Sequence, residues 1–124
     1  MKFTKSALLF TTLLGCITSQ AHADEYYTGV MSALQQNYKE AYSLLKPLSD
    51  KGDPRAIFNL ALMYHAGLFV EFDEKKAVEL YQEAAKLGVR EAQQFLAAGY
   101  REGWFGLPMD YEKYKFWMGQ LGEL

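Results

Sequence analysis

The sequence repeats itself at an offset of 36 residues, and this regularity limits the possible folds more than any other feature. Leu60 matches Leu96 and Gly52 matches Gly88. Other identical pairs in the same frame are Ala41 and Ala77, Ala56 and Ala92, Ala61 and Ala97, Tyr64 and Tyr100, and Gly67 and Gly103. One inserted residue then moves the offset to 37. A period of this size is typical of helical solenoids, in which each unit packs only on its neighbours.

The spacing of apolar residues predicts two helices in each unit. In the second helix of each pair, apolar residues recur at i, i+3, i+4 and i+7, which places them on one face of an α-helix. These residues are Ala41, Leu44, Leu45 and Leu48, then Ala77, Leu80, Tyr81 and Ala84, then Tyr114, Trp117, Met118 and Leu121. The pattern predicts helices over 25–36, 38–51, 54–66, 73–87, 90–102 and 110–121, and residues 68–72 form a loop in this interpretation. The expected fold is all-α, built from antiparallel helix pairs.

Residues that end helices fall at the boundaries of these segments. Asp53, Asp73 and Asp110 each precede a predicted helix, where a carboxylate can accept bonds from free backbone N–H groups. Gly52 and Gly88 follow the second helices, where a residue with positive φ is favoured. The local signals therefore agree with the period.

The first 23 residues have the pattern of a secretory signal peptide. Lys2 and Lys5 provide a positive start, and the apolar stretch that follows over 7–14 is too short to cross a bilayer of about 30 Å. Ala21-His22-Ala23 is a small-x-small site, which predicts cleavage between Ala23 and Asp24. Residues 24–124 then form a single repeat domain with units over about 24–52, 53–88 and 89–124. Its expected location is the periplasm or the exterior, and no transmembrane span is expected in the mature chain.

Two alternatives for this segment stay open. Leu13-Leu14-Gly15-Cys16 resembles a bacterial lipobox, in which Cys16 would be lipidated and the protein would be an outer-membrane lipoprotein. The segment could instead be a buried N-terminal helix of the fold. Cleavage after Ala23 would remove Cys16, the single cysteine, and a chain without cysteine is compatible with an oxidising compartment.

The repeated residues also resemble a known family. The run Ala56-x3-Leu60-Ala61-x2-Tyr64-x2-Gly67, continued by Asp73-x2-Lys76-Ala77-x2-Leu80-Tyr81-x2-Ala84-Ala85-x2-Gly88, is similar to one complete Sel-one-like repeat (SLR). This family is related to tetratricopeptide repeats. Residues 38–52 resemble the end of a preceding unit and residues 92–124 a further unit, so about two and a half units are expected. Phe69 differs from the family pattern, which usually has a second glycine there.

The resemblance implies a short right-handed α-solenoid and a role as an adaptor in protein assembly. It also implies that the first helix of each unit lines a concave face. With Leu60, Ala61 and Tyr64 buried, the residues expected on that face form a candidate site for another protein or peptide. They are Arg55, Phe58, Asn59, Leu62 and His65 in one unit, and Glu91, Gln94, Phe95, Ala98 and Arg101 in the next. An N-terminal helix over 25–36 that covers Phe58 and Leu62 is the alternative.

The inventory of reactive residues argues against catalysis. After cleavage His65 is the one histidine, so no imidazole pair is available for a metal site, and no serine sits in the strand-turn-helix elbow of a hydrolase. We interpret His65 as a solvated helix residue. A formal charge of −2 gives no basic field for nucleic acid. We therefore expect no cofactor and no enzymatic activity.

Three hypotheses for function follow. The first is an exported module that binds another protein. The second is a small envelope enzyme or ligand binder that uses an aromatic-rich groove. The third is a structural solenoid that self-associates through its C-terminal helix, on which Phe116, Trp117, Met118 and Leu121 have no following unit to cover them.

Overall fold

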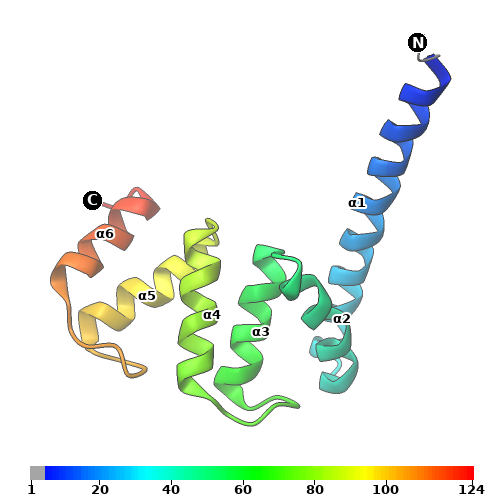
Figure 1. Cartoon of the computed structure of the whole chain (residues 1–124). Helices are drawn as coiled ribbons and strands as arrows, with labels where there is room; N and C mark the ends of the chain where they lie inside the picture. The colour runs from blue at the N-terminus through cyan, green and yellow to red at the C-terminus, as the bar shows by residue number, and fades with distance from the viewer. Residues whose placement is uncertain (1–4) are drawn as a thin grey trace.

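The computed structural model describes residues 5–124, with side chains from residue 20 onward (Figure 1). The regular secondary structure of these residues is entirely helical. The helices are α1 (Lys5–Leu34), α2 (Tyr38–Asp50), α3 (Pro54–Ala66), α4 (Glu74–Lys86), α5 (Arg90–Glu102) and α6 (Tyr111–Leu121). Five of the six predicted helices are confirmed to within one residue at each end. None of the described helices is both long and apolar enough to cross a membrane.

The five helices after α1 start and stop within one residue of the predicted positions. The side chains of Asp53, Asp73 and Asp110 accept bonds from backbone N–H groups in the first turns of α3, α4 and α6. Gly52 and Gly88 have φ values of +88° and +92°, a region that favours glycine because it has no Cβ. These caps fix the lengths of the helices independently of their packing.

Each helix packs mainly against the helices that precede and follow it in the sequence. The contacts run in order from α1 with α2 to α5 with α6, as in a solenoid of antiparallel pairs. The predicted apolar stripes face this stack. Leu60 and Leu96, which are equivalent in the repeat, are 2% and 0% exposed.

The N-terminal helix differs from the expectation of a helix over 25–36. α1 is continuous from Lys5 and projects away from the other helices at its start (Figure 1). The predicted cleavage point between Ala23 and Asp24 therefore lies inside a helix. Lys2 lies outside the described residues, and nothing is described for the side chain of Cys16.

The C-terminal helix is less open than predicted. Trp117 and Leu121 are buried, because α6 turns its apolar stripe toward α5. Met118 is half-buried, and Phe116 is exposed. Trp117 and Leu121 are thus buried as their place on the predicted apolar stripe indicates, and the self-association hypothesis, which needs all four side chains uncovered, is wrong for these two.

Candidate functional site

The first helices of the three units form one continuous face. Tyr26 of α1 bonds to Asn59 of α3, and the ring of His65 on α3 lies 5.6 Å from the ring of Phe95 on α5. The ten residues predicted for this side of α3 and α5, together with Tyr26, are called the first-helix face from here on. Among them Arg55, Leu62, Glu91, Gln94 and Arg101 are exposed, and Tyr26, Phe58, Asn59, His65, Phe95 and Ala98 are half-buried.

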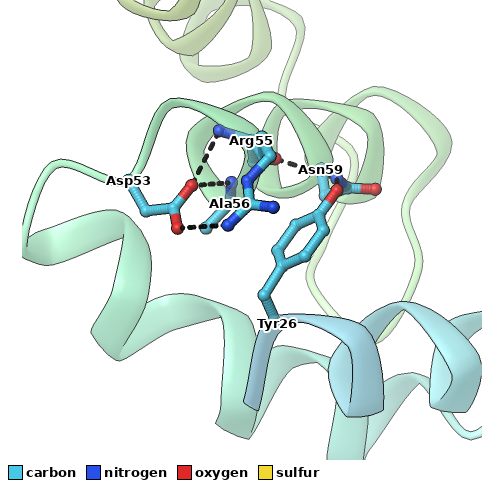
Figure 2. A network of polar contacts seen from close by, with 5 residues as sticks. All are labelled: Tyr26, Asp53, Arg55, Ala56 and Asn59. Atoms are coloured by element: carbon cyan, nitrogen blue, oxygen red, sulfur yellow. Dashed lines mark hydrogen bonds and ion pairs between the residues drawn. The ribbon is translucent and has the colours of Figure 1, made fainter. Parts of the chain in front are cut away.

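A small polar network joins α1 to α3 (Figure 2). Asn59 Nδ2 donates to the hydroxyl oxygen of Tyr26 at 3.1 Å and to the carbonyl oxygen of Arg55 at 2.8 Å. The guanidinium of Arg55 lies 4.2 Å from the centre of the Tyr26 ring, a cation–π contact. The α1 helix therefore borders the face at this end and does not cover Leu62, which is 40% exposed.

Asp53 fixes Arg55 at the start of α3. Its carboxylate accepts the backbone N–H groups of Arg55 and Ala56 and pairs with the Arg55 guanidinium at 3.2 Å. Partial burial by itself would raise the pKa of this carboxyl, but the bonds from Arg55 and the two backbone amides outweigh it and lower the pKa below its usual value. Asp53 therefore stays ionised and orients Arg55 toward Tyr26.

An open pocket of about 350 Å³ lies at this end of the face. Its walls come from all three units: Tyr26, Arg55, Phe58, Asn59, Val89 and Glu91. Its lining combines one basic residue, one acidic residue and two aromatic rings. A pocket of this chemistry can accept an apolar side chain flanked by polar backbone groups, as a peptide offers.

The middle of the face rests on an aromatic cluster. The rings of Tyr81 and Phe95 stack with centroids 3.9 Å apart, and Phe105 from the α5–α6 loop stacks on Phe95 at 4.5 Å. Phe58 also touches Tyr81, with centroids 5.8 Å apart, which accounts for its partial burial. The cluster holds α3, α4 and α5 in a fixed relation and leaves Leu62 above it.

His65 belongs to this cluster, so its interpretation as a solvated residue is wrong. Its Nδ1 lies 3.0 Å from the hydroxyl of Tyr81, and its ring meets the edge of Phe105 at 4.5 Å. Burial raises the pKa of Tyr81 to about 12, and its phenol shares one hydrogen bond with the imidazole of His65, whose direction depends on the histidine tautomer. The role of His65 in this geometry is to position the aromatic rings beneath the face.

The far end of the face is more polar. Gln94 and Arg101 are exposed on α5, and Ala98 lies half-buried between them. Arg101 pairs with its neighbour Glu102 at 2.7 Å, with both side chains largely in solvent. Such an exposed pair contributes little to stability, so Arg101 is available to a partner.

Three residues of this site were not found by sequence reasoning. Tyr26 and Val89 lie outside the helices from which the face was predicted, and Phe105 lies in a loop. A signal existed for Phe105, because it stands 36 residues after Phe69 and both have positive φ, at 56° and 66°. In each case the loop directs an aromatic ring back onto an earlier helix: Phe69 contacts Tyr42 of α2, at 5.3 Å.

Comparison with known proteins agrees with this architecture. The family model for the Sel1 repeat matches residues 21–53, 54–89 and 90–119. The chain belongs to the Sel1 repeat family. The resemblance read from the sequence is thereby confirmed, with three Sel1 repeats in place of the expected two and a half. Sel1 repeats generally mediate protein interactions and are generally not catalytic.

Two solved Sel1-like structures are similar to this chain. One is a protective antigen present in uropathogenic Escherichia coli strains and displaying an SLR fold, with 29% identity and a TM-score of 0.72 over 86% of this chain and 23% of that one. The other is a Sel1 repeat protein from Oxalobacter formigenes, with 26% identity and a TM-score of 0.60 over 67% of this chain and 63% of that one. This chain thus spans less than two thirds of either protein. No curated protein sequence matches it closely.

Proposed function

We propose that this Sel1 repeat protein is an exported, non-catalytic module that binds a segment of another protein along its first-helix face. The observation that carries the proposal is the continuity of that face across three units. An open pocket occupies one end, exposed Leu62 the middle, and exposed Arg101 the other end. The Oδ1 atom of Asn59 and the amide of Gln94 offer hydrogen-bonding groups for the backbone of an extended peptide.

Export is part of the same proposal. The first matched repeat begins at residue 21, so all but the last three residues of the segment with the signal-peptide pattern precede the repeats. Cleavage between Ala23 and Asp24 would leave residues 24–34 of α1, including Tyr26 and its contacts with α3. The N-terminus of the native protein tests this by intact mass. Asp24 at the start supports a periplasmic or secreted protein, a diacylated Cys16 supports a lipoprotein, and an uncleaved Met1 refutes both.

Binding is tested with a substitution that leaves the core unchanged. We expect the protein to capture a partner from envelope extract, and Leu62→Asp to weaken that capture by about tenfold or more, because it places a charge at the centre of an apolar contact. The matched control is Glu79→Lys on α4, which is exposed and lies outside the face. Equal capture by both variants would refute the assignment of the face.

A further inference from the structure

The outer side of α1 carries a stripe of large apolar residues in solvent. Tyr27, Met31 and Leu34 are spaced i, i+4 and i+7, so they share one side of the helix. They are 61%, 52% and 73% exposed. Single exposed apolar residues are ordinary, but a group on one side of a helix marks a contact surface.

The repeat shows which contact this side of a first helix makes. Tyr27 lies seven residues before the end of α1, as Asn59 does in α3 and Phe95 does in α5. The three residues therefore hold equivalent positions in the first helices of the three units. Phe95 stacks on Tyr81 and meets His65, both in the preceding unit, and Asn59 bonds to Tyr26 in the preceding unit. In the second and third units, the residue at this position therefore contacts the preceding unit.

Met31 and Leu34 continue this side of α1, but their equivalents do not repeat the contact. The α5 equivalent of Met31 is Gly99, which lies against Leu107 of its own unit, and the equivalents of Leu34 are the exposed Ala66 and Glu102. Tyr27 is therefore the residue of the stripe whose position a preceding unit covers.

The complementary surface lies at the other end of the molecule. Tyr81 and His65 receive the ring of Phe95, and their equivalents one unit later are Met118 on α6 and Arg101 on α5. Met118 is half-buried and Arg101 is exposed. A thioether and a guanidinium both make favourable contacts with an aromatic ring, so this surface suits a tyrosine.

We propose that copies of this chain associate head to tail, with the α1 stripe of one copy packed on Met118 and Arg101 of the next. The contact repeats the one that α5 makes with the second unit. It joins two different surfaces, so it is heterologous and further copies can add in the same direction. It shares Arg101 with the first-helix face but does not involve Leu62, and it does not depend on the peptide-binding role of that face.

Sedimentation of the protein, in the form that the cell leaves after any N-terminal processing, tests the proposal. We expect its average mass to rise with concentration. Met31→Glu alters the head surface and Arg101→Glu the tail surface, and both residues are exposed, so both variants should keep the helical circular dichroism of the parent. Each variant alone should dissociate, with a dissociation constant raised by about tenfold or more.

Mixing the two variants separates this arrangement from any other. Each retains one intact surface, so the mixture should form a one-to-one dimer that does not grow. Leu62→Asp, the matched control on the first-helix face, should associate like the parent. A parent that is monomeric at every concentration would overturn the proposal. So would a Met31→Glu variant that still dimerises, because that result indicates a symmetric contact.

Discussion

Truncation of Leu96 to alanine tests whether the repeat frame determines the core. The side chain is fully buried, and truncation removes three carbon atoms, worth about 0.8 kcal/mol each in lost burial. A residual cavity of roughly 50 Å³ would add about 1.2 kcal/mol at ~24 cal/mol per Å³. The expected loss in the free energy of unfolding is therefore about 3.6 kcal/mol, inside the range of about 2.7–5.0 kcal/mol for such changes.

Urea denaturation followed by circular dichroism measures this loss. With an m-value of about 1.5 kcal/mol/M, the midpoint should fall by about 2 M and the m-value should stay unchanged. Leu60→Ala, at the equivalent position of the second unit, should behave alike. Glu79→Ala and Lys86→Ala, on the exposed side of α4, should stay within about 0.5 kcal/mol of the parent. Similar losses in all four variants would refute the helical phase from which the fold is argued.

Three further predictions concern local chemistry. Gly88→Ala should destabilise the protein by about 1 kcal/mol because φ there is +92°. Gly119→Ala, inside α6 with no atom close to its new methyl group, should stabilise it by about 0.5–1 kcal/mol. Thermal unfolding of the two variants measures both changes. Tyr81→Phe should abolish the tyrosine that titrates at about 12 in ultraviolet absorbance. Since that pKa is raised on folding, the parent should lose stability as pH rises from about 10 through 12, and the variant should lose less. Asp53→Asn keeps an N-cap acceptor but loses the ion pair with Arg55. Because folding lowers the pKa of Asp53, the stability difference between parent and variant should be present above about pH 4 and shrink as pH falls further.

Helix ends and the buried stripe were predictable because their causes are local. The Asp53 cap and the positive φ of Gly88 involve residues next to them in sequence, and the burial of Leu60 follows from the phase of one helix. The placement of Arg55, Leu62 and Arg101 in solvent on one side was predictable for the same reason. Their role in binding stays a prediction.

The errors arose where two elements meet. His65 has the spacing of a solvated residue, yet it lies against Tyr81, Phe95 and Phe105 because the α5–α6 loop bends back over α3. Trp117 lies on the predicted apolar stripe, but the self-association hypothesis left it uncovered, and it is buried where α6 packs on α5. Helical phase gives the side of the helix on which a residue lies, but not the distance at which the next element packs.

The period is read directly from residues about 36 apart, and five of the six helices, their caps and the apolar stripe follow from residues within about one or two turns of one another. The contacts that complete the first-helix face depend instead on tertiary packing. The bond between Asn59 and Tyr26 joins residues 33 apart, and the pocket beside it takes walls from three units. Such contacts depend on how the helices cross and how the loops fold back, and these follow from packing of the whole stack.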